Sequence, residues 1–342
     1  MADSSEKHGG EKLGAAPVVF GEPLVRHIYT ADPSAHVFDG RIYIYPSHDI
    51  EAGIPATDEG DHFDMVDYHV LSLGDFGGPV VDHGPVLHLK DVPWAQKQLW
   101  APDAAEKNGN YYLFFPAKDR SGIFRIGVAT SKSPAGPFMA RPEPIAGSYS
   151  IDPCAFVDDD GSAYLYFGGI WGGQLERWQT GKYDPKASAP ALDAPALRPR
   201  VARLDAEMTG FDGDVRELSI VDAAGKPLLA GDTDRRFFEA SWMHKHRGTY
   251  YFSYSTGDTH FLAYATSQSP LGPFTYRGRL LEPVVGWTTH HSIVEFRGRH
   301  YLFYHDSSLS GGVTHLRCVK VAELQHEADG SIRVAQPAAG KR

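Results

Sequence analysis

The sequence predicts an all-β protein, a single-domain five-bladed β-propeller, from three observations. A Gly-x-x-Tyr pattern occurs five times, and each copy runs on into a stretch rich in aromatic and β-branched residues. A second pattern, Ser-Pro-x-Gly-Pro-Phe, occurs twice, at residues 133–138 and 269–274. The copies are spaced too widely for short solenoid repeats, and this spacing suits propeller blades with inserted loops. The five copies are Gly40-Arg-Ile-Tyr43, Gly109-Asn-Tyr-Tyr112, Gly161-Ser-Ala-Tyr164, Gly248-Thr-Tyr-Tyr251 and Gly298-Arg-His-Tyr301.

Each copy predicts a β-hairpin, because Gly supplies positive φ in a tight connection and the residues after it favour strands. Upstream of each Gly lies a second shared position, near the start of the hairpin's first strand. The innermost strand of every propeller blade begins near the central channel, so we expect these positions to converge at one mouth. In chain order they are Asp32, Ala101, Asp152, Glu239 and His290.

The blades follow one another along the chain. Blade one covers roughly residues 23–85 and contains a polar insertion at 51–67, which we interpret as a solvated loop, with a metal site as the alternative. Residues 184–200, rich in Ala and Pro, predict a long irregular loop. The last strand, near residues 312–321, is expected to pair with N-terminal residues and close the ring. Blade two contains residues 111–115 and 126–131, and blade three contains a strand at 164–167. Blade four resumes with residues 235–243 and blade five with residues 287–294.

Composition narrows the possible partners and the location. The formal net charge is -10 and no Lys/Arg block occurs, which argues against nucleic acid as a partner. Residues 1–19 are expected to form a disordered tail without a signal peptide or membrane anchor, so we expect a cytoplasmic protein. The propeller is expected over residues 20–322, with a C-terminal extension over 323–342, and an oligomer is possible. Cys154 either packs in a strand or lies near the site.

The shared position carries three carboxylic acids, which suggests acid–base chemistry. Glycoside hydrolysis needs one protonated carboxyl group and one ionised carboxylate, and a third can adjust their pKa values. Glu239 is flanked by Phe237, Phe238 and Trp242, which favour its neutral form and suit a general acid. Asp32 is then the base and Asp152 the modulator. The alternative is a channel whose acids bind ions or water without catalysis.

Five motifs in this order resemble glycoside hydrolase family 43, over essentially residues 20–322. The resemblance implies an inverting propeller enzyme that cleaves β-xylosidic or α-L-arabinofuranosidic bonds, with Asp32 as general base, Asp152 as pKa modulator and Glu239 as general acid. It leaves no room for a C-terminal β-sandwich module. The motifs are residues 27–38 around Asp32, Trp100-Ala-Pro-Asp103, Ile151-Asp152-Pro153, Phe238-Glu239-Ala240 and His290-His291-Ser292.

The resemblance also implies binding residues. His290 matches a family histidine near a calcium ion in the channel, so one Ca ion is a possible cofactor; a channel histidine bonded to water is the alternative. We expect Trp100, His291 and Arg317 to contact the sugar, although a core Trp and a surface Arg are the rival interpretations. Trp171 and Trp287 are further candidates for the outer pocket.

The predicted function is an exo-acting β-D-xylosidase on xylo-oligosaccharides that also cleaves α-L-arabinofuranosides. The alternatives are a chain that acts mainly on arabinofuranosides, including arabinose-substituted oligosaccharides, and a non-catalytic sugar-binding propeller. Invertase-like fructosidases also use three carboxylates on a five-bladed ring. Their Asn-Asp-Pro, Arg-Asp-Pro and Glu-Cys motifs are missing, because Ala31 precedes Asp32, Ile151 precedes Asp152 and Ala240 follows Glu239.

Overall fold

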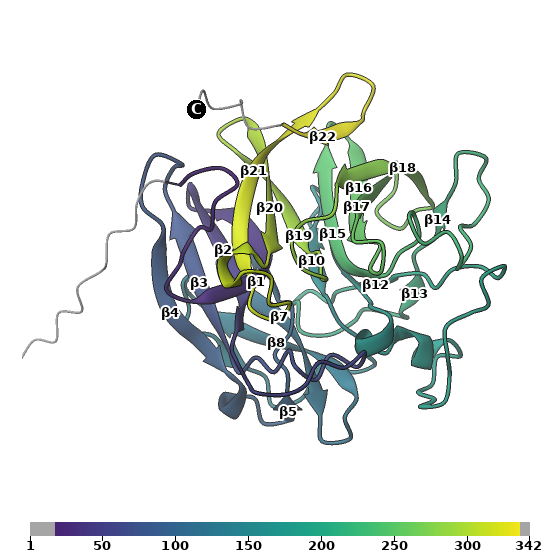
Figure 1. Ribbon diagram of the computed structural model, residues 1–342, viewed down its shortest axis with the longest axis horizontal. Coiled ribbons are helices and arrows are strands. Elements are labelled where there is room, and N and C mark those ends of the chain that lie inside the picture. The colour runs from purple at the N-terminus through teal and green to yellow at the C-terminus, as the bar shows by residue number, and fades with distance from the viewer. Residues whose placement is uncertain (1–17, 336–342) are drawn as a thin grey trace, which may run out of the picture.

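Five β-sheets arranged as a five-bladed propeller make up the computed structural model, which describes residues 18–335 (Figure 1). The predicted fold class is therefore confirmed. Most of the predicted tail, residues 1–17, lies outside the described residues, as do residues 336–342. Within the described part of the chain, no helix is long and apolar enough to cross a membrane.

The first two blades come from the N-terminal half of the chain. Blade 1 consists of β1 (Tyr29–Phe38), β2 (Arg41–Asp49), β3 (Asp67–Leu73) and β4 (Val81–His88). Blade 2 consists of β5 (Ala95–Lys97), β6 (Asp103–Lys107), β7 (Asn110–Asp119), β8 (Phe124–Ser131) and β9 (Met139–Ala140). A short 3₁₀ helix, η1 (Leu89–Asp91), connects them.

The other three blades follow in chain order. Blade 3 consists of β10 (Cys154–Val157), β11 (Ala163–Phe167), β12 (Arg200–Arg203) and β13 (Arg216–Glu217), with η2 (Trp171–Gly173) and η3 (Leu175–Trp178) after β11. Blade 4 consists of β14 (Ile220–Val221), β15 (Glu239–His246), β16 (Thr249–Ser255), β17 (Leu262–Ser267) and β18 (Phe274–Leu281). Blade 5 consists of β19 (His291–Phe296), β20 (Arg299–Asp306), β21 (Cys318–His326) and β22 (Ile332–Val334), with η4 (Ser308–Ser310) after β20.

The five predicted hairpins are β1–β2, β6–β7, β10–β11, β15–β16 and β19–β20. The Gly of every copy has φ between 71° and 81°, as the turn chemistry requires. In four copies the preceding residue also has positive φ, which is typical of a type I′ turn whose twist matches the strands. Local turn chemistry therefore sets the start of the second strand in each blade.

The N-terminal segment closes the ring against blade 5. Backbone N–H groups of Gly21, Leu24 and Thr30 donate to the carbonyl oxygens of Val321, Val319 and Arg317, respectively. This agrees with the predicted closure by the last long strand. The predicted boundary at residue 322 is wrong, because β21 continues to His326 and β22 adds a fourth strand to the blade.

Large aromatic side chains fill the space between and within the blades, among them Tyr45, Phe114, Tyr166 and Phe252, all fully buried. Cys154 belongs to this packing: it is 1% exposed, and its sulfur accepts a hydrogen bond from the N–H of Met243. Of the two interpretations of Cys154, the structure supports the packed strand cysteine.

Candidate active site

A pocket of about 440 Å³ opens at one end of the central channel, and all five blades contribute to it. The five residues at the shared repeat position, Asp32, Ala101, Asp152, Glu239 and His290, all line it. Each lies in or just before the first strand of its blade's hairpin, that is β1, β6, β10, β15 or β19. The ring geometry thus brings together side chains that are far apart in the sequence.

Local backbone irregularities orient the acids toward the pocket. Asp32 and Asp152 have φ of 48° and 54°, a left-handed conformation that non-Gly residues rarely adopt. The register of the first hairpin shifts between Ala31 and Ser34 in blade 1, and between Glu239 and Trp242 in blade 4. Such bulges change the direction of a side chain and are common next to active sites.

Asp32 is held as an ionised carboxylate. Its Oδ1 accepts from Nη1 of Arg317 at 3.0 Å, and its Oδ2 accepts from the Ser47 hydroxyl at 2.7 Å. Its backbone N–H donates to Nδ1 of His305 at 2.9 Å. Burial alone would raise the pKa of Asp32, but the Arg317 charge, the neighbouring His305 and His290 rings and the Ser47 hydrogen bond lower it to about 2. A carboxylate of this kind is ready to accept a proton.

Arg317 is fixed in turn by a buried partner, Asp49. Its Nε and Nη2 donate to the two carboxylate oxygens of Asp49 at 2.8 and 2.7 Å, and its backbone N–H donates to Oδ2 at 2.9 Å. This two-pronged contact leaves Nη1 for Asp32. The structure thus places Arg317 in the pocket lining rather than on the surface.

Glu239 has the opposite environment. Phe238, the preceding residue, is buried and also lines the pocket, and among residues 18–335 no hydrogen bond to the Glu239 carboxyl group is found. Burial, reinforced by the negative charge of Asp32, raises the pKa of Glu239 to about 8. The carboxyl group is therefore protonated at neutral pH and can donate.

Asp152 lies beside Glu239. Its Oδ2 accepts from the N–H of Ala240, the residue after Glu239, at 2.7 Å. Burial and the negative charges of Glu239 and Asp32 raise the pKa of Asp152. Because the two carboxyl groups disfavour each other's ionisation, the pair retains a proton at neutral pH.

His290 offers a free nitrogen to the pocket. Its Nδ1 accepts from the N–H of His291 at 2.8 Å, while its Nε2 is buried and has no hydrogen-bond partner in the described part of the chain. Burial lowers the pKa of His290, so the ring is neutral. Calcium prefers oxygen ligands, so an ion at this nitrogen would need water oxygens for the rest of its coordination.

His291 does not contact the pocket, contrary to the sequence prediction. It is 0% exposed, and its Nε2 lies 2.6 Å from the Ser253 hydroxyl, between blades 4 and 5. Successive residues at the start of a strand point to opposite faces, so His290 and His291 cannot both face the channel.

Aromatic rings form the pocket wall. Trp100 lines it, with Nε1 donating to the Phe63 carbonyl at 2.7 Å, so the core interpretation of Trp100 is not supported. Trp171 is 39% exposed and stacks on Trp287, with ring centroids 5.8 Å apart. These rings offer flat apolar faces of the kind that pack against a pyranose or furanose ring.

The insertion at residues 51–67 covers part of the pocket from the same chain. Thr57, Asp58, His62 and Phe63 are among the lining residues. Two ion pairs hold the loop in place: Glu59 with Arg177 at 2.6 Å, and Asp61 with Lys97 at 2.9 Å. These two acids pair with cations, which supports an anchored loop rather than a metal site.

Sequence reasoning missed Ser47, Asp49 and His305, which support Asp32. Ser47 and His305 share a position seven residues after the repeated Gly, as does Ser255. Ser255 lies opposite Glu239 in the β15–β16 register, and Ser47 lies opposite Ala31 in blade 1. A comparison of the repeats at this second position therefore points to Ser47 and His305, whereas no repeated pattern marks Asp49.

Comparison with known proteins places the chain among close relatives. The model of Glycosyl hydrolases family 43 matches residues 80–332. Xylosidase/arabinosidase 43A of Humicola insolens is 61% identical over 324 residues, which are 92% of this chain and 99% of that protein. A β-xylosidase/α-arabinofuranosidase from a compost microbial metagenome, solved with xylotriose in a calcium-free form, is 65% identical with a TM-score of 0.91. That alignment covers 96% of this chain and 99% of the solved chain.

Proposed function

Because the chain belongs to glycoside hydrolase family 43, and is therefore a glycoside hydrolase, we propose that it releases xylose from the non-reducing end of β-1,4-xylo-oligosaccharides with inversion. One observation carries this proposal. The same pocket holds an ionised Asp32 and a Glu239 whose pKa is raised to about 8. Such opposite protonation states are what a base and an acid on either side of a glycosidic bond require.

The mechanism follows from these states. Glu239 donates its proton to the leaving oxygen, while Asp32 accepts a proton from the water that attacks the anomeric carbon. Arg317 and Ser47 keep Asp32 ionised and oriented before the reaction. Asp152 orients the Glu239 segment through the Ala240 N–H and opposes the ionisation of the acid.

Action at a chain end suits a pocket whose inner strands are tied together a few residues beyond the acids. Below the lining residues, the buried Asp103 carboxylate accepts from Nε2 of His36 at 2.7 Å and from the N–H of Ala155 at 2.6 Å. The Ser292 hydroxyl, in blade 5, accepts from the N–H of Ala35 in blade 1 at 3.0 Å. These contacts join neighbouring blades a few residues beyond Asp32, Asp152 and His290, which favours a pocket that takes one end of a xylan chain.

The substrate class comes from the relatives. Two proteins that are 61% and 53% identical to this chain are named xylosidase/arabinosidase 43A and β-xylosidase. We extend the proposal to α-L-arabinofuranosides, cleaved in the same pocket.

A mixture of an aryl xyloside and an aryl arabinofuranoside tests for a shared pocket. If the two substrates compete for one pocket, the total rate lies between the rates measured with each substrate alone. Two separate sites would instead give the sum of those rates.

Proton NMR of xylobiose hydrolysis tests the mechanism. Inversion produces α-xylose first, before mutarotation mixes the anomers. Early β-xylose would contradict the assignment of Asp32 as a base acting on water. No turnover of xylobiose together with turnover of an arabinofuranoside would shift the proposal to an arabinofuranosidase.

Calcium is part of the proposal through His290, with an ion of this kind helping to order the channel when bound. The buried, unpartnered Nε2 of His290 supports this. Addition of calcium to chelator-treated protein should raise the melting temperature of the wild type but not of a His290→Ala variant. Equal melting temperatures with and without calcium would leave His290 as a histidine that binds only water.

A further inference from the structure

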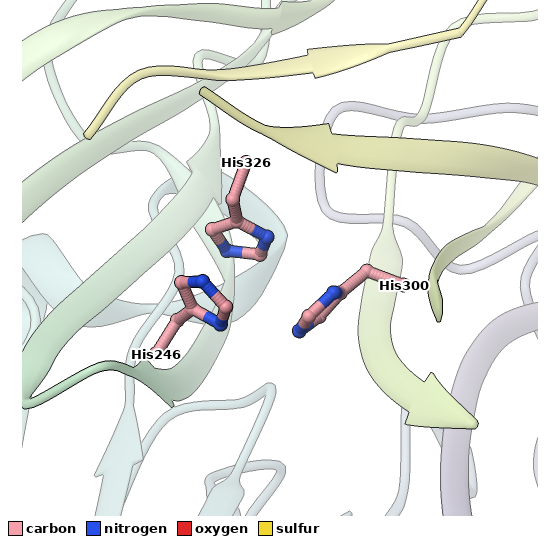
Figure 2. A group of neighbouring side chains, drawn as sticks. All are labelled: His246, His300 and His326. Atoms are coloured by element: carbon pink, nitrogen blue, oxygen red, sulfur yellow. The ribbon is translucent and has the colours of Figure 1, made fainter. Parts of the chain in front are cut away.

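Three histidines gather at the junction of blades 4 and 5, away from the pocket. His246 ends β15, His300 lies near the start of β20, and His326 ends β21. Figure 2 shows the three imidazole rings on separate strands, directed toward one another. One nitrogen from each ring lies within 4.8 Å of the other two.

The cluster lies at the opposite end of the strands that build the pocket. β15 begins at Glu239 and ends at His246, and β20 runs from the region of His300 to that of His305. At about 3.3 Å per residue, the eight residues of β15 separate the two regions by roughly 20 Å. The calcium proposal for His290 and the mechanism therefore make no use of these three rings.

Hydrogen bonding within the protein does not account for this arrangement. The rings of His246 and His326 stack with centroids 4.0 Å apart, and those of His300 and His326 are 4.3 Å apart. Nδ1 of His326 is buried without a hydrogen-bond partner in the described chain. Nε2 of His326 lies 3.1 Å from Nε2 of His244, a fourth imidazole behind the cluster. Three clustered imidazoles, one of them with a buried and unpartnered nitrogen, form a donor set that can hold a metal ion.

We propose that His246, His300 and His326 bind one divalent transition-metal ion, with zinc as the preferred ion, and that this ion ties blade 4 to blade 5. Three imidazoles with one open position suit zinc and its neighbours, whereas calcium and magnesium prefer oxygen ligands. His244 is placed to support His326 from behind, as outer partners of ligating histidines commonly do.

A second group, His48, Asp67 and His69, provides an internal control. Its nitrogens and carboxylate oxygens are also within 4.8 Å of one another. Here, however, both histidines have carboxylate partners within 3.0 Å: Nδ1 of His48 lies 2.6 Å from Asp67, and Nδ1 of His69 lies 3.0 Å from Asp82. In the first cluster the carboxylate beside a ring is the exposed Glu295, at 3.5 Å from Nε2 of His300. These pairs satisfy the rings without an ion, so we propose no site there.

Calorimetric titration of the full chain with Zn²⁺ alone, after chelator treatment and dialysis, tests the proposal. The wild type should bind one equivalent of zinc that the His246→Gln and His300→Gln variants lack or bind at least about 100-fold more weakly, since even outer-shell losses cost 10- to 100-fold. A His48→Gln, His69→Gln double variant should retain that equivalent. Unchanged binding in both His246→Gln and His300→Gln, or loss only in the double variant, would overturn the assignment.

Two further measurements do not depend on the variants. Co²⁺ in place of zinc should give the intense visible bands of a four-coordinate ion, and the weak spectrum of hydrated cobalt would overturn the proposal. Zinc at about 100 times its Kd should raise the Tm of the wild type by a few degrees but leave that of His300→Gln unchanged. An equal rise in the Tm of both proteins would also contradict a metal link between the blades that depends on His300.

Discussion

Nη1 of Arg317 lies 3.0 Å from Oδ1 of Asp32, while the other edge of the same guanidinium group is occupied by Asp49. The Arg317 cation therefore pairs with two buried carboxylates that have different roles. Asp49 fixes the position of Arg317, and Arg317 keeps Asp32 ionised. The proposed base depends on a partner 285 positions away in the sequence.

Replacement of Arg317 by Gln should shift the acid side of the pH–rate profile to higher pH. The pKa of Asp32 is lowered to about 2, so the carboxylate is ionised throughout the usual assay range. Without the Arg317 charge that pKa should rise by about 1 to 3 units. The loss of kcat/KM in the variant should then be larger at mildly acidic pH than at pH 7. Arg317→Lys keeps the charge and should keep most of the acid tolerance. A Gln variant whose acid side is unchanged would show that Arg317 does not control the base.

Loss of the Asp49 charge should destabilise the fold. Asp49 and Arg317 are 2% and 3% exposed, and breaking a buried ion pair typically costs about 3 to 5 kcal/mol. We expect Asp49→Asn to lower the free energy of unfolding by that amount in a denaturant titration. Asp234→Asn, which breaks the exposed Arg279–Asp234 pair at 2.8 Å, should cost less than about 1 kcal/mol. Similar small losses in both variants would refute the structural role of Asp49.

Replacement of Glu239 by Gln should remove the proton donor. We expect kcat on xylobiose to fall about 10²- to 10⁴-fold, with a much smaller loss on an aryl xyloside whose leaving group needs no proton. Wild-type activity should decline as the pH rises through about 8, because the acid form is the active one and is lost above its pKa. The remaining activity of the variant on the aryl substrate should lack this decline.

A control for Glu239→Gln is Glu282→Gln, which alters a side chain that is 72% exposed. It should leave both substrates unaffected. Equal losses of Glu239→Gln activity on xylobiose and on the aryl xyloside would argue against a role in protonating the leaving group.

Asp152→Asn should move the alkaline decline to lower pH. Two carboxyl groups that share a proton titrate as a pair, and the negative charge of Asp152 opposes loss of the last proton from Glu239. The amide removes that charge but can still accept from the Ala240 N–H, 2.7 Å away. A pH–rate profile of kcat measures the shift. An alkaline side that stays in place would leave Asp152 with only an orienting role.

The repeats explain why so much of the site was predictable from sequence. Turn chemistry around Gly40 and its four counterparts is local, and ring symmetry maps equivalent positions such as Asp32 and Glu239 to the same channel mouth. The motif resemblance to family 43 is likewise confirmed by the family match over residues 80–332. Local patterns combined with repetition thus predicted the fold and brought the acids together.

The features that the sequence did not reveal depend on long-range pairing. Asp49 and Arg317 are 268 residues apart, and nothing near Asp49 indicates its partner. β22 is only three residues long, too short for an alternating pattern, so the end of blade 5 was placed too early. The inward position of His291, by contrast, follows from strand alternation, since adjacent strand residues face opposite sides.

Trp171→Ala should weaken substrate binding more than it slows the reaction. Trp171 is exposed at the pocket rim, stacks on Trp287 and meets Phe238 edge to face at 83°. Loss of an aromatic face costs about 1.4 kcal/mol, which corresponds to a roughly tenfold rise in KM for xylotriose. Because Trp171 has a φ of 56°, Trp171→Phe is the matched control, with the same backbone strain and a retained ring. If steady-state kinetics show the same KM for the wild type and for the Phe and Ala variants, the sugar does not stack on Trp171 and another aromatic residue of the lining, such as Trp100, forms the wall.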